Sequence, residues 1–172
     1  VVELGFSNTI CAAIILIGLL VMIGSATTTF SLVLKEGISS WITVSRAERL
    51  KLDIRLLLNI ASVGDRAINI TVRNTGSRTI FLVNGWNDVI VAYNASGYWR
   101  PFLSNFDIEQ VRVAGSETAF SPLSHPYINP GEEAVITIQI PAEAPDIPHG
   151  SVVMVVFATH YGVSAVGEAV RP

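Results

Sequence analysis

Histidines and aspartates are the residues of this sequence whose types could best support acid–base or metal chemistry. The three histidines lie far apart, without an HExxH spacing and without a neighbouring cysteine that could complete a zinc site. The five aspartates occur singly, so neither an EF-hand loop nor a paired-carboxylate site is visible, although carboxylates can converge in space. These residues are His125, His149, His160, Asp53, Asp65, Asp88, Asp107 and Asp146.

Sequence signatures of common enzyme classes are also missing. The chain contains no Gly-x-Ser-x-Gly motif, no phosphate-binding glycine loop and no dinucleotide fingerprint. We therefore expect a protein that is not an enzyme and that uses no cofactor and no metal ion.

Two asparagines match the acceptor pattern for N-glycosylation, N-x-[ST]. They are Asn69, in Asn69-Ile-Thr71, and Asn94, in Asn94-Ala-Ser96. Asn94 falls in a predicted exposed turn, whereas Asn69 falls in the middle of a predicted strand. If this part of the chain is extracellular, Asn94 is the better candidate for modification.

Four aromatic residues gather around two predicted loops and could anchor a protein partner. They are Trp86, Tyr98, Trp99 and Phe102. The alternative is that these side chains close one end of the folded domain, and the sequence leaves both interpretations open.

Composition limits the function classes. Hydrophobic residues make up 50% of the 172 residues, charged residues make up 15%, and the mean hydropathy is +0.50, which suggests a membrane segment. The 11 basic and 14 acidic residues leave a formal charge of −3, so the chain lacks the broad cationic surface that nucleic-acid binding needs. One compact domain with an anchor fits this length.

The anchor is the run Leu4–Leu34, in which the thiol of Cys11 is the only ionisable side chain. About 20 apolar residues in a helix cover the roughly 30 Å hydrocarbon core of a bilayer, so the run predicts a transmembrane helix within residues 1–34. Packing in the core of a protein filament would demand a similar composition, and small residues would permit close neighbours there. The residues that we expect to serve as anchor or filament core are Ala12, Ala13, Ile14, Ile17, Gly18, Leu20 and Gly24.

Residues 35–51 place apolar side chains among Ser, Lys, Arg and Glu and predict a helical stalk, which Gly37 could interrupt. From residue 52 to 172 the hydrophobic period becomes two, which predicts strands separated by turns rich in Gly, Asn and Pro. About seven strands without a helical pattern between them indicate an all-β, immunoglobulin-like antiparallel sandwich. The predicted strands are 53–60, 67–73, 79–83, 88–93, 108–113, 134–140 and 151–159, with turns at 74–77, 84–85, 94–97 and 129–131 and a long loop over 116–129.

Several short motifs occur in a characteristic order. Gly5-Phe-Ser7 precedes the apolar run Ala12–Gly18, and the strand and turn Ile70–Gly76, the turn Asn129–Gly131 and the segment His160–Ser164 follow. In this order they resemble the archaellum accessory protein FlaF (ArlF) family, which is related to archaeal type IV pilin-like proteins. The resemblance covers nearly the whole chain.

The resemblance implies a location and a role. Members of that family have one membrane helix and an immunoglobulin-like β-sandwich outside the archaeal cell. They act with the partner FlaG and bind the S-layer as part of the stator of the rotary archaellum. We therefore expect a cell-envelope protein whose partners are an S-layer protein, a FlaG-like protein and the membrane.

The N-terminus differs from the family pattern. Leu4 stands where the family has its initiator methionine, and Val1–Glu3 precede it, so we expect either an upstream start or processing. Archaeal pilins and archaellins are cleaved just before an apolar helix that then forms the filament core. A subunit of such a filament, with identical subunits as partners, is therefore the alternative function, although Glu3 is not at the fifth position where many pilins carry a glutamate.

Overall fold

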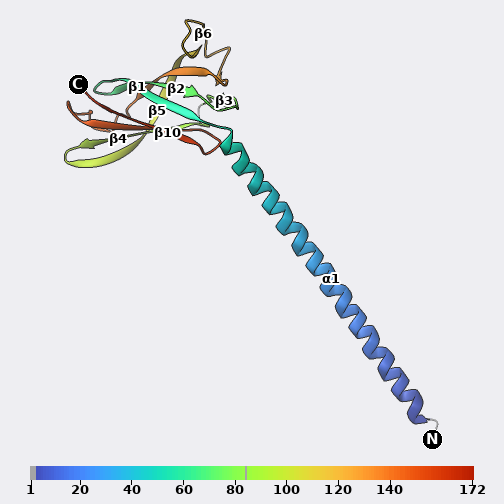
Figure 1. Cartoon of the computed structure of the whole chain (residues 1–172). Helices are drawn as coiled ribbons and strands as arrows, with labels where there is room; N and C mark the ends of the chain where they lie inside the picture. The colour runs from blue at the N-terminus through green and yellow to red at the C-terminus, as the bar shows by residue number, and fades with distance from the viewer. Residues whose placement is uncertain (1–2, 84) are drawn as a thin grey trace. The chain divides into compact units, whose positions relative to one another are not determined.

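The computed structural model describes residues 3–83 and 85–172 of the chain (Figure 1). The chain divides into two units, residues 1–48, which are helical from Glu3 onward, and residues 49–172, which contain every strand of the described residues. Val1 and Val2, which bear on the question of processing, and Asn84 of a predicted turn lie outside the described residues.

The first element is one unbroken helix, α1 (Glu3–Leu52), of 50 residues. At 1.5 Å per residue its length is about 75 Å. Gly37 lies inside α1 without ending it, since a single glycine costs a helix only about 1 kcal/mol and the sequence has no proline before Pro101. The predicted anchor and stalk segments are thus parts of the same helix.

Five hydroxyl side chains interrupt the hydrocarbon of α1 between residues 25 and 31. Each donates a hydrogen bond, 2.8–2.9 Å long, to a helix carbonyl three or four residues earlier. Because the hydroxyls are paired inside the helix, this segment can lie in an apolar environment without unpaired donors. The five residues are Ser25, Thr27, Thr28, Thr29 and Ser31.

The side chains of residues 8–34 are exposed all round the helix. By length and composition, Asn8–Leu52 is the single helix of the described residues that could cross a membrane. An apolar helix without a polar face is stable only when lipid or other protein covers it. The anchor residues named above, including Ile14, Ile17 and Leu20, therefore lie on a surface that requires such a cover.

Among the described residues, ten strands follow α1, and every pairing between them is antiparallel. The antiparallel all-β fold behind an apolar helix confirms the predicted fold class. The strands are β1 (Leu56–Val63), β2 (Ala67–Asn74), β3 (Ile80–Phe81), β4 (Asp88–Ala95), β5 (Tyr98–Val113), β6 (Ala119–Phe120), β7 (Tyr127–Ile128), β8 (Glu132–Gln139), β9 (Val152–Ala158) and β10 (Ser164–Val170).

Strand β5 belongs to both layers of the sandwich. Its first half pairs with β4, and its second half pairs with β8. One layer has the order β1-β2-β8-β5 with β6 at its edge, and the other has the order β5-β4-β9-β10; β3 and β7 form a separate small ladder. Strands β1 and β10 approach each other so closely that a Cβ atom on Gly167 would overlap the side chain of Leu58.

The core lies between the two layers and follows from strict alternation in their strands. In β2 and β8 every second residue is buried, and these residues are apolar except for Asn74 at the end of β2 and Glu132 at the start of β8; Ile70 and Ile136 are a fully buried pair. The other layer contributes inward residues such as Val91, Tyr93 and Phe157, which have no exposed surface. This alternation is typical of a sheet with one face in a core.

Three sequence expectations need correction. The strand predicted over 108–113 is the end of β5, which begins at Tyr98; Pro101 fits there because this half of β5 is an edge strand that pairs only with β4. Strand β10 was not predicted, since Gly and Ala weaken its strand pattern. The segment predicted as a long loop over 116–129 contains the short strands β6 and β7.

A tight turn after β2 is hydrogen-bonded to residues 53–55, at the start of the β domain. The backbone N–H of Gly76 donates to the carbonyl of Arg55 (3.1 Å), and that of Ser77 donates to the carbonyl of Asp53 (2.8 Å). Arg78 also pairs with the carboxylate of Asp53 at 3.3 Å. A Cβ atom on Gly76 would overlap the backbone of residues 53–55, so this close approach requires glycine.

Candidate functional site

The two outer faces of the sandwich differ in chemistry. The layer of β1, β2, β8 and the end of β5 carries polar side chains outward, and many of them bond to each other. The hydroxyl of Thr137 donates to Asn69 (2.9 Å), Asn69 donates to Ser62 (3.1 Å), and Arg112 pairs with Glu133 at 2.7 Å. We call the outer surface of this layer the polar face; outward polar side chains are expected where a sheet contacts solvent.

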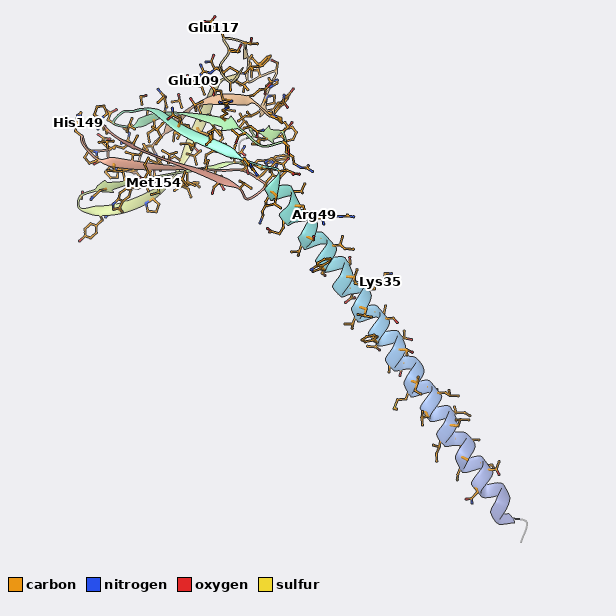
Figure 2. The ribbon with its side chains drawn as sticks, viewed as in Figure 1. Lys35, Arg49, Glu109, Glu117, His149 and Met154 are labelled. Carbon is orange, nitrogen blue, oxygen red and sulfur yellow. The ribbon has the colours of Figure 1, made fainter. Side chains whose placement is uncertain are left out.

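The opposite layer, made of the first half of β5 with β4, β9 and β10, is apolar on its outer side as well. Figure 2 labels one residue of each layer, Met154 on β9 and Glu109 on β5. Three cross-strand rows form what we call the apolar face. They are Leu103, Ile90, Val156 and Val166; Pro101, Ala92 and Met154; and Trp99, Val152 and Val170.

Several residues of the apolar face are widely open to solvent. Leu103 is 67% exposed, Val166 is 55% exposed and Trp99 is 52% exposed. Two polar side chains, Asn94 and Glu168, share this side of the sheet with them. Monomeric soluble proteins rarely present such a continuous apolar surface, and where one occurs it usually marks a contact with another molecule.

The strand sequences explain why only one layer has this property. Strand β8, Glu132–Gln139, alternates buried apolar residues with half-buried or exposed ones that include Thr and Glu. Strand β9 reads Val-Val-Met-Val-Val-Phe-Ala, so both of its faces are apolar. A strand that is apolar at every position is expected where both sheet faces are covered. The β9 sequence is therefore the local signal from which the apolar face could have been predicted.

The four aromatic residues proposed as partner anchors lie in three different places. Trp99 belongs to the apolar face, and Tyr98 projects to the other side of the same hairpin, 70% exposed. Phe102 packs inward against Tyr93, with ring centroids 5.3 Å apart. Trp86 precedes β4, whereas Tyr98 follows it, so Trp86 lies toward the other end of the strand, 5.2 Å from the ring of His160.

The two sequons also differ in their surroundings. Asn69 is half-buried in the polar face, where its side chain bonds to both Ser62 and Thr137. Asn94 is exposed, opposite Trp99 at the end of the β4–β5 hairpin. A transferase could reach Asn94 without breaking hydrogen bonds of the sheet, so the contacts favour Asn94 as the acceptor.

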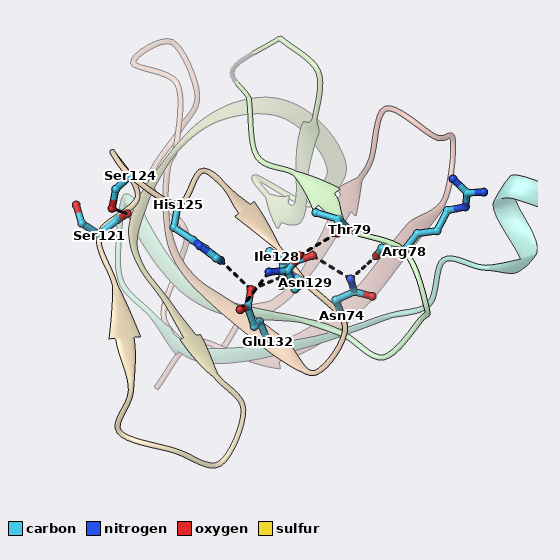
Figure 3. A network of polar contacts seen from close by, with 9 residues as sticks. All are labelled: Asn74, Arg78, Thr79, Ser121, Ser124, His125, Ile128, Asn129 and Glu132. Carbon is cyan, nitrogen blue, oxygen red and sulfur yellow. Dashed lines mark hydrogen bonds and ion pairs between the residues drawn. The ribbon is translucent and has the colours of Figure 1, made fainter.

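His125 and Glu132 form a largely buried polar pair (Figure 3). The imidazole Nε2 lies 2.9 Å from Oε2 of Glu132, and the backbone N–H of Asn129 donates to the same oxygen at 2.8 Å. The His125 ring stacks on Phe120, with centroids 4.7 Å apart. Burial alone would raise the pKa of Glu132, but the hydrogen bonds from His125 and Asn129 outweigh it, and the pKa lies below its usual value.

The contacts around this pair stabilise the fold. The hydroxyl of Ser124 and the backbone N–H of His125 both donate to the carbonyl of Ser121, at 3.2 and 2.9 Å, so the contacts of this turn serve its backbone. Asn74 crosses to the same region and donates to the carbonyls of Arg78 and Ile128 (2.6 and 3.0 Å). The network therefore joins the segment before β8 to the end of β2.

The other two histidines lie elsewhere. His149 contacts the backbone carbonyl of Pro172 at 2.7 Å, and His160 packs against the rings of Trp86 and Tyr161. Burial lowers the pKa of His160. Within residues 3–83 and 85–172, no three His, Cys, Asp or Glu side chains lie together in a way that could hold a metal ion.

The sequence matches no protein-family profile and no curated protein sequence. Solved structures do resemble it. A protein of the archaeal flagellum of Methanospirillum hungatei strain JF1 is 15% identical with a TM-score of 0.58, and the match covers 93% of this chain and 91% of that one. At that coverage the shared fold includes both the helix and the β domain.

Two stator structures from Sulfolobus acidocaldarius are also similar in part. The archaellum periplasmic stator protein FlaG has a TM-score of 0.43 at 16% identity, over 67% of this chain and 99% of that one. The stator protein complex of FlaF and FlaG gives 0.43 and 16%, over 66% and 87%. The chain shares its fold, an N-terminal apolar helix followed by an antiparallel β-sandwich, with the flagellum protein.

Proposed function

We propose that this chain is a non-enzymatic structural protein of an archaellum, held at the archaeal cell surface by its N-terminal helix. The observation that carries the proposal is that one chain combines two apolar surfaces that need a cover, the helix and the apolar face. Such surfaces serve assembly, because their burial against lipid or protein is their main source of free energy.

The helix acts as the tether. Residues 4–34 measure about 46 Å along the helix axis, which is enough to cross a bilayer core of roughly 30 Å with a tilt. The hydroxyls of residues 25–31 are already paired inside the helix, so their transfer into lipid is less costly. Residues 35–51 then serve as a stalk between the membrane and the β domain.

The β domain acts as the fixed part of a motor, a stator component that binds the S-layer and a FlaG-like partner. A rotating filament exerts torque on the envelope, so the motor needs a part that is held both in the membrane and outside it. The apolar face is the surface for one of these partners. A partner that covers Leu103, which is 67% exposed, gains about 1–2 kcal/mol from that side chain alone.

A filament subunit is the second candidate. The similarity to the Methanospirillum hungatei flagellum protein favours it, because it extends over nearly the full length of both chains. In a filament the apolar helices would cover each other, and Ala12, Ala13, Gly18 and Gly24 would allow their backbones to approach closely. The apolar face would then lie between neighbouring subunits.

Electron microscopy of the full chain isolated from native cells distinguishes the two candidates. A membrane-tethered stator component appears as particles that need detergent to stay in solution. A filament subunit appears as ordered fibres. Fractionation in which the chain is recovered in the cytosol, without detergent and without fibres, would contradict both.

A further inference from the structure

Asn94 interrupts the third row of the apolar face. Antiparallel register places it opposite Trp99 of β5, and continuing the register of β4 with β9 places it opposite Val152, which itself pairs with Val170. Trp99, Val152 and Val170 are widely exposed, at 52%, 41% and 58%. This row is therefore a strip of open hydrocarbon that contains one exposed polar side chain.

The turn that follows Asn94 contains an unfavourable serine. Ser96 and Gly97 connect β4 to β5 with φ angles of 57° and 86°. Two-residue turns with positive φ at both positions prefer Asn, Asp or Gly, and within residues 3–83 and 85–172 Ser96 is the one residue other than glycine with a positive φ. A serine is strained there because its Cβ atom crowds the backbone. The turn does not account for Ser96, whereas the acceptor pattern Asn94-Ala95-Ser96 requires a hydroxyl residue at this position.

A hollow lies beside Asn94, between the tip of the β4–β5 hairpin and the segment that leads into β9. Its volume of about 510 Å³ falls in the range of pockets that hold small ligands. Trp99 and Val152 line it together with Gly150 and Ser151, and no charged side chain of the described residues belongs to its lining. An uncharged hollow with an aromatic wall suits a sugar ring, which packs its C–H groups on the aromatic face and turns its hydroxyls to water.

We propose that Asn94 carries an N-linked glycan whose first sugars dock on Trp99 and Val152 and cover this end of the apolar face. The donor is a glycan activated on a lipid phosphate. The bond from C1 of the sugar to the phosphate oxygen breaks, Nδ2 of Asn94 bonds to C1 and loses one proton, and the lipid phosphate leaves with the bonding electrons. The proposal rests on the proposed function in one respect, since the β domain must lie outside the cell to be modified in this way.

The glycan would divide the apolar face between two covers. Leu103 lies four residues along β5 from Trp99, about 13 Å away at 3.4 Å per residue. A glycan docked on Trp99 shields the third row from water and leaves the row of Leu103 open to a protein partner. Its bulk at one end of the face also limits the directions from which that partner can approach.

The test is hydroxyl-radical footprinting of the full chain, purified in detergent from native cells, with mass spectrometry of the glycan and of each tryptophan. Asn94→Gln, produced in the same cells, removes the acceptor. Oxidation of Trp99 should be at least about threefold slower in the unaltered chain than in this variant, because the bulky glycan excludes solvent from the ring. Trp86, at 54% exposed, is the matched control and should be oxidised equally in both chains.

A second variant separates loss of the glycan from damage to the hairpin. Ser96→Asn removes the acceptor pattern and introduces a residue that suits the positive φ better than serine does. This variant should lack the glycan and expose Trp99 as much as Asn94→Gln does. Its unfolding temperature should equal or exceed that of Asn94→Gln.

The location of the β domain is measured separately. Glu117→Cys introduces an exposed thiol, and a membrane-impermeant maleimide applied to intact cells labels it only if the domain lies outside. The unaltered chain, whose one cysteine is Cys11 in the helix, gives the background.

Three results would overturn the proposal. Labelling of Glu117→Cys with an unmodified Asn94 would remove the glycan and leave the proposed function standing. A glycan on Asn94 with equal oxidation of Trp99 in the unaltered chain and both variants would exclude docking on the sheet. Absence of both the label and the glycan would contradict the location outside the cell, and with it the proposed function.

Discussion

Replacing Glu132 by glutamine should weaken the β domain measurably and in a pH-dependent way. Glu132 is 8% exposed, and its carboxylate accepts hydrogen bonds from the backbone and side chain of Asn129 and contacts His125. The glutamine side chain could still accept from the backbone N–H, but it lacks the charge that strengthens these bonds. Hydrogen bonds to charged groups contribute about 1.5–3 kcal/mol, so we expect Glu132→Gln to cost about 2 kcal/mol at pH 7.

The sign of the pH dependence follows from the lowered pKa of Glu132. The stabilisation is fully present above the unfolded-state pKa of about 4.3 and is lost as the pH falls through the lower folded-state value. The unaltered chain should therefore begin to lose its advantage over Glu132→Gln below about pH 4.3, and the advantage should be gone once the pH lies below the lowered folded-state pKa, where both side chains are neutral.

Thermal unfolding of the full chain in detergent, from pH 7 down to about pH 2, measures this effect. A cost of about 2 kcal/mol corresponds to a fall of roughly 8 °C in the midpoint for a domain of this size. Glu117→Gln is the matched control, since Glu117 is exposed in the turn after β5 (Figure 2). Equal midpoints for Glu132→Gln and the unaltered chain at pH 7, or a difference that persists at pH 2, would refute the reasoning.

Three further predictions concern the turn after β2, the two sequons and the apolar helix. Gly76→Ala should cost about 1–3 kcal/mol of unfolding free energy, because its methyl group overlaps the backbone of residues 53–55, whereas Gly37→Ala meets open space and should be tolerated; chemical denaturation compares them. Mass spectrometry of native protein should find a glycan on Asn94 and none on Asn69, and a glycan on Asn69 alone would contradict the contacts described here. Ile17→Asp places a charge in the apolar helix and should abolish membrane insertion or assembly at a cost of several kcal/mol, so normal membrane fractionation and assembly of this variant would count against both candidate functions.

The sequence allowed the helix and the alternating strands to be predicted because their patterns are local. The run Leu4–Leu34 needs only its composition, and β2 and β8 need only their period of two. Strand β10 was not predicted because Gly167 weakens its strand pattern. The reason for this glycine is that it leaves room for the side chain of Leu58 on β1, which is far away in the sequence.

The candidate site was harder to predict than the fold. The aromatic residues were grouped by their place in the sequence, but β4 separates Trp86 from Trp99. The apolar face can be predicted only from the register of four strands. The register of four strands is not a property of one segment, although the fully apolar sequence of β9 was a local sign of the apolar face.

The central claim, that the apolar face is where this protein meets its partner, can be tested by photo-crosslinking in native cells. A photoreactive amino acid replaces Leu103 on the apolar face or, as a control, Thr71 on the polar face, and mass spectrometry identifies the adducts. We predict that a photoreactive residue at position 103, and not one at position 71, crosslinks to an S-layer protein, another archaellum component or a second copy of this chain. Equal crosslinking from both positions, or adducts from position 71 alone, would contradict it.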